Sequence, residues 1–451
     1  MTFRVMLASF RYLTLAAGMV SACHSQERWD RLDFKTANIG GVRLYGISVY
    51  SGYSNFSGPI ATTEQTLVPA NPGDLNYGAQ WTAGWRHQTG KNSVSASYSG
   101  SFGGRAKYSN LNSFGHSLNM EFSRKLWNKW AFSFSASADS RTFAQYLFQP
   151  QSTGVLAQIP GSASDLATSL AASQLVSSTS GLADLLAADR VLFYQGQASV
   201  SYAPSTRLSV NFSSFSAGGQ QSFDKKQTIT MPRSLGGRAG VSVSYALGPR
   251  TNIGVSVDEG RIQTQFQTGY STSGSVFFSR KMGVHWFLNL NGGMSHSRVT
   301  ASGYAAPPSS QVIGGGSLGY RTRNHTFLLN HIRSSQDVYG TIAGLNSMSS
   351  AAWAWSARGS GWRIFSNVGQ NQVRDAGFTS LSGWRASTGV SRNLSDQFSV
   401  NCEYSYLYNT GTYLGVFVSR SVNLVRLSLR WHPMGVIHSG QSSDPTESDR
   451  P

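Results

Sequence analysis

The chain has 451 residues, a length that usually means two or three soluble domains. Charged residues make up 13% against a typical ~25%, aromatic residues 12%, and the 40% of hydrophobic residues give a mean hydropathy of only −0.23. This balance excludes a helical membrane protein and an ordinary charged soluble domain, and it fits strands with one face in lipid and one in water.

The net charge of +17 would suit nucleic-acid binding if the basic residues were clustered. The arginines instead stand singly along predicted strands, which fits a basic channel wall better, so we expect no nucleic-acid partner. The two cysteines, Cys23 and Cys402, form no disulfide framework and match no zinc spacing.

The N-terminus has the pattern of a secretory signal. Two arginines precede a short apolar stretch, Tyr12–Val20, and small residues follow it. We predict a signal peptide at 1–22 and a periplasmic lead at 23–37, because the apolar stretch is shorter than the ~20 residues that span a bilayer. The end of this segment also resembles a lipobox, so Cys23 is either lipidated or an ordinary mature residue.

From there on, side chains alternate in size and polarity with period two, the mark of a half-buried strand. Tyr77, Trp81 and Trp85 alternate with small polar residues, and after a polar turn at 89–92 the alternation resumes. The same hairpin unit recurs down to a last strand that ends at Trp431. We predict an all-β fold, a single antiparallel up-and-down transmembrane β-barrel over residues 38–433, followed by a polar tail at 434–451.

The predicted connections alternate between tight and long, as in barrels with short periplasmic turns and longer outer loops. Pairing them gives about eighteen strands of ~9–11 membrane-spanning residues, with sixteen as the alternative, and puts both termini in the periplasm. The tight turns are expected at 89–92, 126–129, 204–207, 248–251, 281–284, 321–325, 359–362 and 394–397, and the longer links at 54–74, 103–113, 147–190, 216–236, 259–272, 301–310, 336–345, 374–380 and 409–417.

Aromatic residues favour this barrel over a soluble β-sandwich. Many lie beside turns, where an aromatic girdle meets lipid headgroups: Trp127, Trp130, Trp286, Tyr320, Trp362 and Trp431. In this pattern, without a signature motif, residues 38–433 resemble the porin-like outer-membrane β-barrels of bacteria. The resemblance implies a bacterial outer-membrane location, with outer-membrane lipid and the barrel-assembly machinery as partners. The polar tail departs from it, since such chains usually end on an aromatic residue.

If the bulky residues face lipid, an excess of arginine faces the lumen: Arg86, Arg238, Arg358, Arg363, Arg385, Arg426 and Arg430. Such a wall attracts anions and repels cations. The alternative is that these side chains pair with lumen carboxylates and only hold the barrel together. The candidate carboxylates are Glu121, Asp139, Asp258 and Glu403.

The long link at 147–190 contains a segment, 164–176, that reads as helical. Porins commonly fold their third outer loop into the lumen, so the resemblance implies a lid or plug here. A solvent-exposed loop without a gating role is the alternative.

No motif indicates catalysis, a metal site or a cofactor, and we expect none. We therefore predict an outer-membrane channel for small or polymeric solutes, with an anionic solute or polysaccharide as its partner. Export of an acidic exopolysaccharide is one alternative, because the alginate exporter is similar in strand number and arginine-rich lumen. A structural barrel or an outer-membrane enzyme is the other.

Overall fold

The computed structural model describes the barrel strands and most of the tight turns. The described residues are 38–39, 42–57, 60–61, 66–67, 73–107, 112–142, 190–221, 234–264, 267–301, 304–305, 308–338, 341–357, 361–374, 380–413 and 416–433. The predicted signal peptide, the periplasmic lead, Cys23, Arg358, the helical segment of the 147–190 loop and the 434–451 tail lie outside these residues. Of the 147–190 loop only residue 190 is described.

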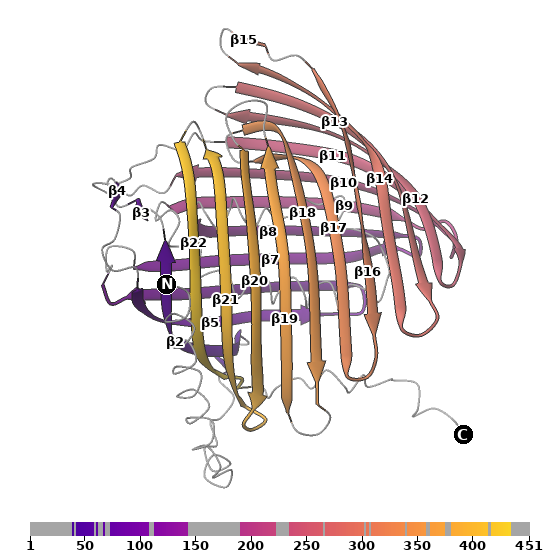
Figure 1. Cartoon of the computed structure of the whole chain (residues 1–451). Helices are drawn as coiled ribbons and strands as arrows, with labels where there is room; N and C mark the ends of the chain where they lie inside the picture. The colour runs from indigo at the N-terminus through magenta and orange to yellow at the C-terminus, as the bar shows by residue number, and fades with distance from the viewer. Residues whose placement is uncertain are drawn as a thin grey trace, which may run out of the picture.

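Within those ranges every regular element is a strand (Figure 1). Eighteen long strands of 13 to 16 residues build the wall. They are β2 (Val42–Ser57), β5 (Gly73–Gln88), β6 (Asn92–Arg105), β7 (Ser113–Trp127), β8 (Trp130–Thr142), β9 (Arg190–Tyr202), β10 (Leu208–Gln221), β11 (Ser234–Gly248), β12 (Thr251–Thr264), β13 (Gln267–Met282), β14 (Trp286–Ala301), β16 (Ser309–Arg321), β17 (His325–Val338), β18 (Thr341–Ser356), β19 (Trp362–Arg374), β20 (Ser380–Asn393), β21 (Phe398–Tyr413) and β22 (Val416–Trp431).

Four two-residue strands complete the set. β1 (Asn38–Ile39) pairs with β2, β15 (Tyr304–Ala305) pairs with β14, and β3 (Ile60–Ala61) pairs with β4 (Thr66–Leu67) as a separate hairpin. No helix of the described residues is long and apolar enough to cross a membrane.

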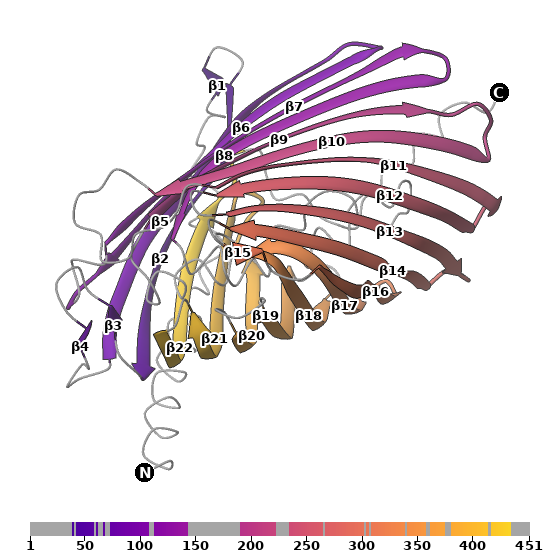
Figure 2. The same ribbon diagram turned by 90° about the horizontal axis from the view of Figure 1, so that it is seen from above.

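The long strands close into one antiparallel barrel. Each pairs with the long strand before and after it, and β22 returns to β2 in a register from Ile47↔Trp431 to Ser57↔Ser421. Figure 1 shows β16–β22 crossing the strands of the opposite wall at a steep angle, and Figure 2 shows the two walls facing each other from above. The predicted fold is confirmed, with eighteen strands rather than sixteen.

Side chains alternate across this wall as the sequence predicts. On β7, Leu118 and Met120 are exposed on the outer face, and on β12, Val255 and Val257 are exposed in the same way. The intervening β12 residues Ser256 and Asp258 are buried on the inner face. Because the sheet is closed, one parity of every strand must face outward and the other inward.

The tight turns lie where they are predicted, but several of the longer links are shorter than expected. β12 and β13 are separated only by residues 265–266, β17 and β18 by 339–340, and β21 and β22 by 414–415. The predicted links at 259–272, 336–345 and 409–417 are therefore wrong in extent. Strand ends beyond the hydrocarbon have water on both faces, so they need no alternation: Glu259 and Arg261 are exposed on the outer parity of β12.

Candidate functional site: the barrel interior

Four of the predicted arginines lie on one stretch of wall made of β19–β22. Arg363 (β19), Arg385 (β20), Arg426 and Arg430 (both β22) occupy inward positions. In the register of the sheet, Arg430 lies opposite Ser399, Arg426 opposite Glu403 and Arg385 opposite Leu407. Ser399 and Leu407 are about 26 Å apart along β21 at a rise of ~3.3 Å per residue, so the arginines follow the length of the wall.

Arg426 is held in an ion pair. Its Nη2 donates to Glu403 Oε2 at 3.2 Å, and both side chains are buried. The hydroxyl of Ser405 donates to the other carboxylate oxygen at 3.1 Å, and the guanidinium lies 5.4 Å from the ring centre of Tyr50. This cluster joins β21, β22 and β2 at the closure of the barrel. Arg426 therefore fits the alternative in which a lumen arginine pairs with a carboxylate and holds the barrel together.

Arg238 on β11 is held in a similar way on another part of the wall. Its Nε lies 3.2 Å from Asp258 Oδ2 on β12, and Ser273 on β13 donates to Asp258 Oδ1 at 2.7 Å. The pair therefore ties together three neighbouring strands. Parity alone cannot reveal this contact, because it depends on the register of β11 against β12.

Arg363, Arg385 and Arg430 have no ion-pair partner among the described residues. Glu403 is the only acidic residue in the described part of strands β19, β20, β21 and β22, and it is already paired with Arg426. The Nε atoms of Arg363 and Arg385 are buried without a hydrogen-bond partner in the described structure. Within the described residues, this stretch of wall therefore carries an excess of positive charge toward the interior.

The other predicted lumen residues are dispersed. Glu121 is exposed on β7, and Asp139 is buried on β8. Arg86 lies on β5, but its side chain is outside the described part of the chain. The structure thus gathers some of the predicted residues on β19–β22 and leaves the others on the opposite wall.

The interior is less uniformly polar than the sequence predicts. The buried apolar side chains all occupy inward positions, and they lie on β14, β16, β17, β19, β21 and β22: Val299, Ile313, Leu328, Phe365, Leu407, Val422 and Leu424. On β22, Val422 and Leu424 share the inner face with Arg426. The sequence contains a sign of these inward apolar residues, because Val422 has the same parity on its strand as the lumen arginine Arg426.

A buried polar cluster at the loop end was missed. Asp74 on β5 is fully buried, and its Oδ1 accepts a bond from the backbone N of Lys107 at 2.9 Å. The Lys107 ammonium donates to the carbonyl of Gly73 at 2.7 Å. Arg105, at the end of β6, is also buried. All these residues fall in the predicted links at 54–74 and 103–113, where parity carries no information.

The predicted girdle residues lie at the tight-turn ends of their strands. Trp127 is 71% exposed, Trp130 stacks on Tyr202 at 4.5 Å between ring centres, and Trp286 contacts Tyr320 at 4.6 Å. Arg392 lies over the Trp362 ring at 5.0 Å, and Trp431 is the last residue of β22. Their shared level is what a headgroup contact requires, and we retain that role as a proposal.

His432 lies at the tight-turn rim, directly after β22. Its Nε2 is 3.3 Å from the Ser399 hydroxyl, and its backbone N donates to the carbonyl of Gln397 at 2.6 Å. Burial, and then the positive charge of Arg430, lower the pKa of His432 to about 4. The folded rim therefore holds this imidazole neutral. Among the described residues no group of His, Cys, Asp and Glu side chains could hold a metal ion.

No protein-family model and no curated protein matches the chain. Solved structures do match over most of its length. OccAB4 of Acinetobacter baumannii is 8% identical with a TM-score of 0.42, covering 88% of this chain and 98% of its own. OccK2 (OpdF) of Pseudomonas aeruginosa is 12% identical with a TM-score of 0.42, covering 86% and 97%.

A BenF-like porin from Pseudomonas fluorescens Pf-5 is 10% identical with a TM-score of 0.42, covering 88% of this chain and 100% of its own. At such low identity we take nothing from these proteins about solutes. The assignment rests on the closed register from β2 to β22 and on the apolar outer face of the wall. The chain folds as a closed, eighteen-stranded antiparallel β-barrel whose outer face is apolar, as in outer-membrane barrels.

Proposed function

We propose that this barrel is a channel that prefers anionic solutes. The observation that supports the proposal is the uncompensated charge on β19–β22, where Arg363, Arg385 and Arg430 face the interior without a described carboxylate partner. In a narrow aqueous path with a low-dielectric wall, fixed charges of one sign concentrate counter-ions and set selectivity.

The arrangement of the charges supports passage rather than a single binding site. The arginines are distributed over about 26 Å of the wall, so an anion could move from one guanidinium to the next. Conduction requires binding that is strong enough for uptake and weak enough, over several sites, for release. The proposal covers small anions and anionic polymers alike, including an exported polysaccharide, because both would contact the same wall.

Reconstitution into planar bilayers under a salt gradient tests the proposal. We expect single-channel conductance with an anion-selective reversal potential. Arg385→Gln should move that potential toward zero. Arg392→Gln is the matched control, since Arg392 lies on the same strand with outward parity beside Trp362 and should leave the reversal potential unchanged. A cation-selective potential in the unmodified barrel would contradict the proposal.

A further inference from the structure

The seam between β16 and β17 is closed over only part of its length. The two strands pair from Arg321↔Thr326 to Gly314↔Arg333. Beyond that point β16 continues beside β14 as far as Ser309, and β17 continues beside β18 as far as Val338 (Figure 1). Residues 309–313 and 334–338 continue the two strands beyond this point, and within the described part of the chain they form no ladder pairs with each other.

Glycines fix the point where the seam divides. Gly314 has a φ of +149°, a conformation that other residues rarely adopt. A Cβ on Gly315 would lie 2.1 Å from the backbone oxygen of His331, so these backbones approach as closely as they do only because no side chain intervenes. Gly292 is the β14 partner of Gly314, and it faces open space. Strand interiors with such glycines bend where another chain approaches or a sheet must turn.

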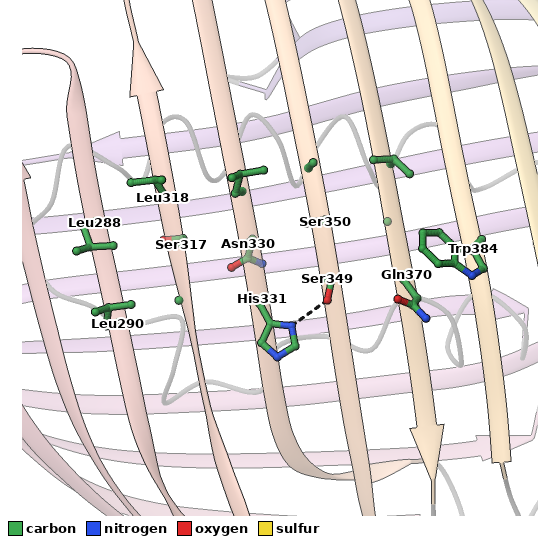
Figure 3. A pocket seen from close by; sticks show the side chains of 15 residues that line it. Leu288, Leu290, Ser317, Leu318, Asn330, His331, Ser349, Ser350, Gln370 and Trp384 are labelled. Carbon is green, nitrogen blue, oxygen red and sulfur yellow. Dashed lines mark hydrogen bonds between the residues drawn. The ribbon is translucent and has the colours of Figure 1, made fainter.

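Below the division, the outer surface of the wall is hollowed into a groove of about 500 Å³, and Figure 3 shows it in close view. Apolar side chains line most of it: Leu288, Leu290, Leu318, Leu329, Val368 and Trp384. Leu290, Leu329 and Trp384 are 47%, 54% and 50% exposed. Small residues at its floor, such as Gly316 and Ala351, leave the space, which has the size of a small-molecule site.

One side of this groove is polar. The Nδ1 of His331 lies 2.8 Å from the Ser349 hydroxyl, and Gln370 lies on the next strand (Figure 3). Two residues further along β17, Arg333 is exposed on the same outward face as His331. Arg333 pairs with Gly314 at the point where the seam divides, so it lies next to the lined part of the groove.

These polar groups lie at the depth of the hydrocarbon. Phe327 belongs to an aromatic cluster with Tyr320 and Trp353 at the tight-turn end. His331 is four residues further along the same strand, about 13 Å at ~3.3 Å per residue, or about 10 Å of height on a strand tilted by ~40°. The apolar band of such barrels is ~25 Å tall. Polar and ionisable groups at this depth are costly, which makes a functional role the first hypothesis for them.

We propose that this groove is a binding site for a single-chain anionic amphiphile, a fatty carboxylate. Its tail lies along Leu290, Leu318 and Leu329, and its carboxylate pairs with Arg333 beside His331. A carboxylate beside Arg333 would also offer hydrogen-bond partners to the backbone groups of β16 and β17 that have no ladder pair beyond Gly314. Lipid tails cannot supply such partners. The site is on the outside of the wall, so it stands independently of whether the lumen conducts.

Fluorescence quenching tests the site directly. Ala351→Cys, in a Cys23→Ser, Cys402→Ser background, puts a bimane label in the groove, and Val276→Cys in the same background puts the label on the outer face of β13 as a control for simple partition into lipid. The probe is ω-brominated dodecanoate, added to the barrel in phosphatidylcholine vesicles. We expect saturable quenching at position 351 and only linear, non-saturable quenching at position 276.

The headgroup contact is tested with charge variants. Arg333→Gln should raise the dissociation constant obtained from the saturable quenching about tenfold or more, which corresponds to the loss of one charge-assisted hydrogen bond. Arg333→Lys should keep most of the affinity. Arg298→Gln, an exposed outer arginine on β14, should change nothing. The proposal is overturned if position 351 behaves like position 276, if Arg333→Gln has no effect, or if phosphatidylglycerol in the vesicles abolishes quenching and so identifies a phospholipid as the occupant.

Discussion

At the scale of single residues, the interior arginines divide into two kinds that sequence parity cannot separate. Arg426 and Arg238 have carboxylate partners at 3.2 Å, while Arg363, Arg385 and Arg430 face the interior without one among the described residues. The paired arginines contribute to the stability of the wall, and the unpaired arginines contribute to the electrostatic potential of the lumen. Substitutions in the two sets should therefore change different measurements.

The Glu403–Arg426 pair should be strongly stabilising against single substitution. Glu403→Gln leaves a buried guanidinium without its counter-charge, which typically costs about 3–5 kcal/mol. Urea unfolding in lipid vesicles should show this loss, whereas Glu121→Gln, an exposed carboxylate on β7, should be nearly neutral. Replacing both partners together, Glu403→Leu with Arg426→Met, should cost less than either single change. Equal stability of Glu403→Gln and the unmodified barrel would refute the structural role.

His432 should make the stability of the barrel depend on pH. Its folded pKa of about 4 lies below its ordinary value near 6.5, so the folded state disfavours the protonated ring. The unfolding free energy should be unaffected above pH ~6.5 and should fall between ~6.5 and 4 as only the unfolded chain takes up the proton. Unfolding titrations over this range should show a weaker decline in His432→Asn. An identical decline in that variant would assign the effect to other groups.

At the scale of elements, glycines decide where a strand may bend. Gly315→Ala should destabilise the barrel by about 1–3 kcal/mol, because the added methyl group would overlap the His331 carbonyl and force the strands apart. Gly292→Ala is the matched control, since its Cβ would meet nothing within 4 Å. Thermal unfolding followed by heat-modifiable electrophoretic mobility compares the two. A Gly315→Ala barrel as stable as Gly292→Ala would disprove the close approach.

Strand positions and parity could be predicted from sequence where one face of a strand meets lipid. There, Val255 and Val257 must alternate with Ser256, and the polar turns between such runs are short. Alternation does not predict the strands beyond the hydrocarbon, where both faces are hydrated. Glu259 and Arg261 continue β12 without an apolar pattern, and Asp74 belongs to β5 although it falls in the predicted link at 54–74. Contacts such as Arg238–Asp258 also require the register, which alternation alone does not fix.

At the scale of the whole molecule, closure of β2 on β22 removes the two edges that an open sheet would expose to lipid. Val49 and Leu429 face each other on the outer side of this seam. Val49→Cys with Leu429→Cys, in a Cys23→Ser, Cys402→Ser background, should form a disulfide on mild oxidation and give a reductant-sensitive change in the mobility of the denatured chain. Val49→Cys alone should show no such change. If the pair does not cross-link, β2 and β22 are not neighbours and the barrel is not closed there.

The central claim is that alternate residues of each strand face lipid and water. Cysteine scanning along β11 from Val241 to Tyr245 tests it most directly, in a Cys23→Ser, Cys402→Ser background, in membranes and with a membrane-impermeant thiol reagent. Cysteines at Ser242 and Ser244 should react, because those positions face the aqueous interior, while cysteines at Val241, Val243 and Tyr245 should be protected until detergent replaces the lipid. Equal reactivity at all of these positions in the intact membrane would contradict the account.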